Sequence, residues 1–137
     1  MKKEVGKLLV LLEKEYEVYN CLYQLAKEKQ EIIMAEDIDQ LEKVVVKEER
    51  LLPKVQALEK EREKLVGEKS LSQLIKEVGE AASDKLEELQ EKLKARVEEL
   101  KDLNQLNGSL LETALQLNNF NLSLLTNNRQ GTYGKQG

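Results

Sequence analysis

Histidine and tryptophan are absent from this chain of 137 residues, and cysteine, proline and phenylalanine occur once each. Without histidine, the commonest general base is missing, and so is the ligand that metal sites in helical bundles ordinarily use. The single thiol, Cys21, has no partner for an internal disulfide and no histidine to activate it as a nucleophile. Neighbouring glutamates such as Glu87 and Glu88 point in different directions on a helix and cannot act as a catalytic pair. We therefore expect no enzyme, no metal site and no cofactor.

Long apolar runs and aromatic residues are also scarce. Aromatic residues make up 4% of the chain and charged residues 35%, which disfavours a thick globular core and favours elongated helices packed along narrow seams. No apolar run is long enough to span a membrane or to serve as the core of a signal peptide. The net charge of −4, with lysines interleaved among glutamates, argues against nucleic acid as a partner. The composition indicates a cytoplasmic protein that does not insert into membranes.

Apolar residues recur at alternating intervals of three and four residues, which predicts three long helices. The first helix is expected over residues 3–34, and Leu8 and Leu22 widen its seam, so it should contact more than one neighbour. A break is expected between Met34 and Asp37, where the Asp37 carboxylate can cap the next helix. The seam of the first helix consists of Val5, Leu9, Leu12, Tyr16, Tyr19, Tyr23, Ala26, Gln30 and Ile33.

The second helix is expected over residues 38–66 and contains two features that disturb a regular seam. Pro53 lacks a backbone donor and clashes with the preceding turn, so we expect a kink or a break at this position. Glu48 and Arg62 fall on the apolar stripe, where we expect them to reach the edge of the seam or to form surface ion pairs.

The third helix is expected over residues 84–128, after a connector at residues 67–83 that contains a short helix. Together these segments predict an all-α fold, an elongated antiparallel helical bundle or coiled coil of three long helices, as a single domain over residues 1–128. Residues 129–137 have no apolar periodicity and should form a disordered tail. Because the third helix is longer than the other two, its carboxy-terminal end should extend beyond the bundle.

The overhanging end of the third helix is the most unusual part of the chain. Between Asn104 and Asn128 only Glu112 is charged, and a second apolar stripe lies about 100° from the seam. A three-helix body can bury only part of such a surface. Residues 104–128 are therefore a candidate partner-binding segment, although a permanent oligomer core or adsorption to a membrane surface would also cover them. The candidate contact residues are Leu111, Leu115, Phe120, Leu122 and Leu125.

The order of several motifs along nearly the whole chain resembles FlgN-type flagellar export chaperones. These motifs are EKEY in the first helix, DIDQL at the opening of the second, EERLLP and EKER further along it, LNQLNGSLLETALQLNNFNLSLL in the third, and the final TYGKQG. The resemblance implies a small cytosolic chaperone of flagellar type III protein export that binds the carboxy-terminal helical region of hook-filament junction proteins. Such a chaperone prevents premature assembly of its cargo and hands it to the export apparatus.

The resemblance also implies that the carboxy-terminal region binds the cargo, which agrees with the apolar stripe described above. A cargo helix would then cover Leu111, Leu115, Phe120, Leu122 and Leu125, and without cargo this surface should self-associate weakly or fray. The competing hypothesis is a structural coiled-coil scaffold, in which the same residues seal a permanent homo-oligomer.

Overall fold

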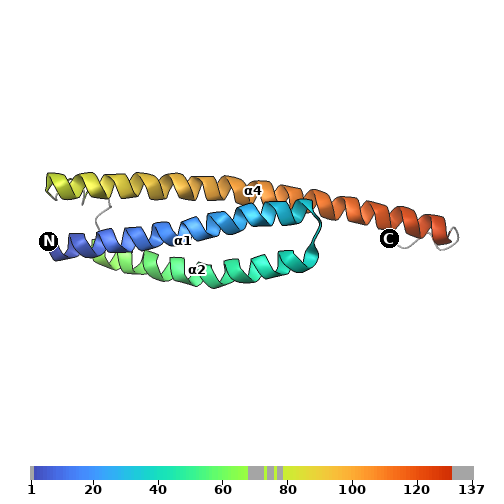
Figure 1. The fold of residues 1–137 in the computed structure, drawn as a ribbon, viewed down its shortest axis with the longest axis horizontal. Helices are drawn as coiled ribbons and strands as arrows, with labels where there is room; N and C mark the ends of the chain where they lie inside the picture. Colours follow the sequence, from blue (N-terminus) through green and yellow to red (C-terminus); the bar gives the residue numbers. More distant parts are fainter. Residues whose placement is uncertain (1, 68–72, 74–75, 77–78, 131–137) are drawn as a thin grey trace.

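Three long helices form the protein in a computed structural model that describes residues 2–67, 73, 76 and 79–130. For residues 2–4 and 117–130 it describes the course of the helical backbone alone. The helices are α1 (Lys2–Met34), α2 (Ile38–Val66) and α4 (Glu80–Gln130), as Figure 1 shows. The all-α bundle of three long helices predicted from the sequence is confirmed.

In the view of Figure 1, α1 lies between α2 and α4. The extensive interhelical contacts are those of α1 with α4 and of α1 with α2. α1 and α2 are antiparallel, whereas α4 runs in the same direction as α1. The central helix therefore buries two of its faces, which explains why its apolar seam is broad.

The turn between α1 and α2 is closed by backbone hydrogen bonds and by one side chain. The Asp37 amide donates to the Ile32 carbonyl at 3.2 Å and the Glu36 amide donates to the Ile33 carbonyl at 3.1 Å, a Schellman arrangement. Glu36 occupies the left-handed position of this motif, with a φ of 57°. The Asp37 carboxylate then accepts a hydrogen bond from the Gln40 amide at 3.1 Å and caps α2, as predicted.

Two apolar clusters hold the three helices together. The first cluster joins α1 to the start of α4 through Leu8, Leu12 and Leu86, all with no exposed surface, and Leu65 and Val66 of α2 pack against it. The second cluster joins all three helices near the middle of the bundle, around Leu22, Ala26, Val55 and Leu100. Each fully buried leucine contributes about 1.5 to 3 kcal/mol relative to an exposed one, so the clusters are the main source of stability.

The seam predicted for α1 coincides with the buried one at Val5, Leu12, Ala26 and Ile33, but elsewhere the buried residue precedes the predicted one by one position. Leu8 and Leu22, expected at its margin, are buried, whereas Leu9, Tyr16 and Gln30 are only half-buried. The physical reason is that α1 packs against two helices, α2 and α4. The middle of its apolar surface therefore coincides with neither of the two faces that are buried. The buried residues of the helix are Val5, Leu8, Leu11, Leu12, Glu15, Leu22, Ala26 and Ile33.

A polar layer containing a fully buried carboxylate separates the two clusters. Arg62 Nε lies 3.0 Å from Glu15 Oε2 and donates a hydrogen bond of 3.3 Å to Oε1. Burial raises the pKa of the Glu15 carboxyl above its ordinary value; the charge of Arg62 opposes this rise and the charge of Glu59 adds to it. Glu59 in turn accepts a 2.7 Å hydrogen bond from the Tyr19 hydroxyl. This layer fixes the register of α2 against α1.

Of the two alternatives predicted for Arg62, the surface ion pair was wrong, because its partner Glu15 is fully buried. The Arg62 side chain itself is 29% exposed, which is consistent with a position at the edge of the seam. Glu48 forms an ion pair with Lys29 of α1 at 3.2 Å, and both side chains are partly exposed. An arginine on a seam can be neutralised by a carboxylate on the neighbouring helix, and Glu15 of α1 supplies that carboxylate for Arg62. The heptad series Leu8, Leu12, Glu15, Tyr19 and Leu22 contains the signal that would have located this partner.

α2 continues through Pro53, so the break considered at this position does not occur. Pro53 is exposed, which leaves the Glu49 carbonyl open to water where the helical hydrogen bond is missing. Figure 1 shows α2 as a gently bowed helix. The short helix expected in the connector lies largely outside the described residues.

α4 begins at Glu80, one turn earlier than the sequence suggested. The Ser83 amide donates to the Gly79 carbonyl at 2.8 Å, so Ser83 already lies within the helix. Ala82 packs against the first apolar cluster, which explains why the helix extends back to this turn. Further along, the Asn107 side chain donates a buried 2.8 Å hydrogen bond to the Ala26 carbonyl and aligns α4 with α1.

Candidate functional site

The end of the bundle that contains the α1–α2 turn carries an apolar groove of about 450 Å³. One wall comes from the end of α1 and the start of α2, and the other comes from α4. Ile33 forms part of its buried base, whereas Ile38 is 66% exposed and Leu115 is 54% exposed. The residues lining this end groove are Ile32, Ile33, Glu36, Asp37, Ile38, Leu41, Leu111, Ala114 and Leu115.

Beyond Leu115, α4 extends past the rest of the bundle. α1 ends at Met34, near the level of the end groove, whereas α4 continues to Gln130. Residues 116–130 therefore form a protruding helix of about 22 Å, which Figure 1 shows beyond the α1–α2 turn. The overhang expected from the lengths of the helices is present.

Two of the five candidate contact residues lie in the end groove. Leu111 is half-buried there, and Leu115 is exposed beside it. Phe120, Leu122 and Leu125 belong to the protruding part of α4, and their side chains lie outside the described residues. Hence the groove and the protruding helix are continuous, because the same helix forms a wall of one and the whole of the other.

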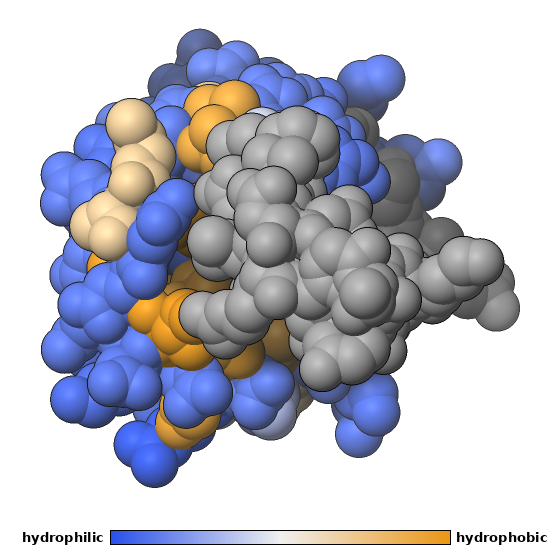
Figure 2. Space-filling view, turned by 90° about the vertical axis from the view of Figure 1, so that its right-hand side faces the viewer, coloured by the Kyte–Doolittle hydropathy of each residue, from blue (hydrophilic) through white to orange (hydrophobic). Residues whose placement is uncertain are grey.

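Sequence reasoning missed the wall that faces α4. Met34, 70% exposed, and Ile38, 66% exposed, flank the turn beside this groove. Figure 2, which views this end of the molecule, shows apolar surface in orange between the hydrophilic rim and the grey atoms. An apolar residue on each side of the predicted break was the available signal, but its significance depends on α4 passing beside the turn.

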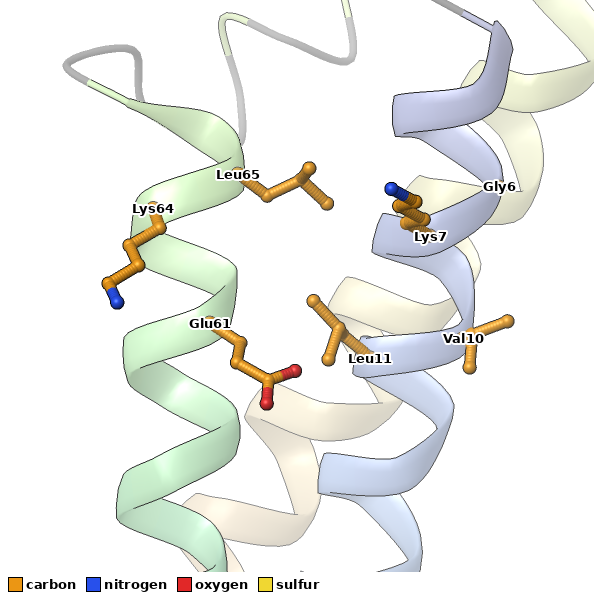
Figure 3. A pocket seen from close by; sticks show the side chains of 7 residues that line it. All are labelled: Gly6, Lys7, Val10, Leu11, Glu61, Lys64 and Leu65. Atoms are coloured by element: carbon orange, nitrogen blue, oxygen red, sulfur yellow. The ribbon is translucent and has the colours of Figure 1, made fainter.

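A second apolar depression lies at the opposite end, between the start of α1 and the end of α2. Figure 3 shows Leu11 and Leu65 extending into the space between the two helices. Lys7, Glu61 and Lys64 also line it, so its charges are of both signs. It lies at the other end of the bundle from the protruding helix and contains none of the predicted contact residues.

Within the described part of the chain there is no group of three or more potential metal-ligating side chains. No helix among those residues combines the length and hydropathy needed to cross a membrane. The end groove is lined mainly by aliphatic side chains, which recognise a partner by burial of apolar surface.

An elongated helical bundle with an apolar groove at one end and a protruding helix beside it belongs to the class of helical protein-binding proteins. The comparison with protein families agrees with this class. The model of the FlgN protein family matches residues 1–137, the whole chain, and the chain belongs to that family. No curated protein and no solved structure gave a significant match. Members of the FlgN family are flagellar export chaperones, which bind flagellar substrate proteins, and the family is not known for enzymatic activity.

Proposed function

We propose that this protein is a cytoplasmic chaperone that binds the carboxy-terminal helices of hook-filament junction proteins and assists their type III export. The observation that carries the proposal is the continuity of the end groove with the protruding part of α4. A cargo helix enters the groove beside Leu115 and continues along Phe120, Leu122 and Leu125. Binding in this way covers cargo surface that would otherwise assemble prematurely.

The exposed leucine of the end groove supports helix recognition energetically. Leu115 is 54% exposed and Leu111 half-buried, so both retain apolar surface that a partner can cover. Complete burial of an aliphatic side chain yields about 1.5 to 3 kcal/mol, and several such residues offset the cost of ordering a peptide. Affinities in the micromolar to nanomolar range follow, which suits a partner that must later be released.

Calorimetric titration with the carboxy-terminal segments of hook-filament junction proteins tests the proposal. Leu115→Asp places a charge in the groove and should weaken binding by at least about tenfold, because an unpaired carboxylate would have to be buried. Leu106→Asp is the matched control: Leu106 is 46% exposed and lies nine residues earlier, on the opposite face of α4.

The proposal requires the Leu106→Asp protein to bind like the unaltered chain. Equal losses in both variants would mean that a general disturbance of α4 is responsible. Unchanged affinity in the Leu115→Asp variant would remove the groove from the cargo surface. Light scattering over a dilution series would reveal the scaffold alternative as an oligomer that does not dissociate.

A further inference from the structure

A basic groove lies on the side of the bundle, away from the end groove. It runs between the middle of α1 and the middle of α2 and has a volume of about 530 Å³. Leu25 and Leu51 form its apolar floor, and both are half-buried. The α2 wall carries three exposed cations, Lys47, Arg50 and Lys54, whereas the α1 wall consists of the uncharged residues Asn20, Cys21 and Gln24.

The three cations have no partner within the described part of the chain. None of them takes part in an ion pair or a hydrogen bond there, whereas Lys29, Arg62 and Arg96 are all paired with glutamates. Like charges three and four residues apart on one helix destabilise it. A cationic stripe therefore costs the isolated protein stability, although the chain as a whole is acidic, with a net charge of −4.

The groove is also limited in length. Lys47 and Lys54 are seven residues apart, which corresponds to about 10 Å, or two helical turns. The adjoining groove shares Lys47 and Arg50 with the basic groove, and Glu28, Asp39 and Glu42 are also in its lining. An occupant of this groove must therefore place its negative charges within two turns.

From this arrangement we propose that the basic groove binds an acidic amphipathic helical segment of a protein partner. Apolar side chains of the segment cover Leu25 and Leu51, and carboxylates spaced by three or four residues face the cations of α2. A protein segment fits better than nucleic acid or a membrane. The apolar floor offers nothing to a phosphate backbone, and a recessed surface cannot insert into a lipid interface.

The end groove and the basic groove are distinguishable by charge. Glu36 and Asp37 line the end groove, so an acidic segment is repelled there. No acidic residue lines the basic groove. The proposal for the basic groove is thus independent of the cargo proposal, and each can fail without the other.

The experiment uses the full chain and a designed helical peptide of about four turns, with leucines on one stripe and glutamates beside it. A second peptide carries glutamine in place of each glutamate. Fluorescence anisotropy measures the affinity, and the rate at which a maleimide modifies Cys21 locates the peptide. Cys21 is exposed and is the only cysteine of the chain, so occupation of the basic groove should slow its reaction several-fold.

The test variant replaces Lys47, Arg50 and Lys54 with glutamine. Its matched control replaces three exposed lysines outside the basic groove, Lys14, Lys60 and Lys94, with glutamine and changes the net charge by the same amount. We expect the test variant to bind the acidic peptide about tenfold more weakly, and the control variant to change by less than about twofold. Added salt should weaken the binding of the unaltered protein.

Four results would overturn the proposal: equal affinities of the test and control variants, no protection of Cys21, equal binding of the glutamine peptide, or no binding of the acidic peptide.

Transfer RNA and vesicles of phosphatidylglycerol serve as competing probes. Binding of either one that depends on the three cations, without binding of the peptide, would assign the groove to a different kind of partner. Because the three side chains are exposed and their removal relieves the repulsion along α2, the test variant should unfold at the same urea concentration as the control or at a slightly higher one.

Discussion

The buried ion pair between Glu15 and Arg62 provides a strong test of the physical account of this fold. Replacing Arg62 with methionine retains most of its apolar contact but removes the charge that faces a fully buried carboxylate. We expect the Arg62→Met variant to be less stable than the unaltered protein. In the double variant Glu15→Leu, Arg62→Met, the stability should return or exceed its original value, because an apolar pair needs no desolvation of charge.

Two limits set the loss of stability expected for the Arg62→Met variant. Breaking a fully buried pair costs about 3 to 5 kcal/mol, but the Arg62 side chain is 29% exposed, so part of its charge is already hydrated. The Glu15 carboxyl can also avoid being buried as an unpaired charge by binding a proton. At pH 7, protonating a group with an ordinary pKa of 4.5 costs about 3.4 kcal/mol, which sets a ceiling. We therefore expect a loss of about 2 to 3 kcal/mol for Arg62→Met.

The same pair determines a pH dependence with a defined sign. The pKa of Glu15 is raised in the folded protein, so the folded state retains this proton to higher pH than the unfolded chain does. Its contribution to stability is therefore fully present below pH 4.5 and is lost as the pH rises through the folded pKa. Relative to a Glu15→Gln variant, the unaltered protein should lose stability over this window. In the Arg62→Met variant the loss should extend to higher pH.

Urea unfolding followed by circular dichroism at several pH values measures these quantities. With a slope of about 2 kcal/mol per molar urea, the Arg62→Met variant should unfold at about 1 to 1.5 M less urea than the unaltered protein. A double variant as unstable as Arg62→Met would refute the reasoning, since the loss would then come from packing. An Arg62→Met protein of unchanged stability would refute the reasoning as well, because water would then have to reach the Glu15 carboxylate in the folded protein.

Two further substitutions test the backbone of the fold. Pro53→Ala restores a helical donor at an exposed position of a continuous helix and should raise stability by about 1 to 3 kcal/mol, measured by thermal unfolding; no gain would mean that the bowed shape of α2 compensates for the missing hydrogen bond. Glu36→Gly relieves a left-handed residue at a φ of 57° and should stabilise the protein by about 1 kcal/mol in urea, whereas the control Glu36→Ala should give no gain.

Much of the candidate site was accessible to reasoning from the sequence. The uncharged segment after Asn104 and the lengths of the three helices predicted a protruding apolar helix, and the structure confirms that the helix protrudes. The facing wall of the end groove, formed around Ile38, was not accessible in this way. Whether an apolar residue beside a turn is covered depends on a helix more than seventy residues away in the chain.

The basic groove shows a similar division. Lys47, Arg50 and Lys54 follow one another at helical intervals, so the sequence alone places these three cations on one face of the second helix. Their significance depends on the neighbouring helix, because an uncharged wall leaves the cations unpaired whereas an acidic wall would neutralise them. Only the register of α2 against α1 decides between these cases.

The sequence by itself determined the three helices, the break at Asp37, the overhang and the membership in a helical class, because apolar periodicity and capping are local properties of the chain. The tertiary structure decided that α1 is central, that Glu15 meets Arg62 across 47 positions, and which helix faces form grooves. A seam of heptads shows that a helix has a neighbour. It does not show how many neighbours there are or at what level they meet, since those depend on contacts between distant segments.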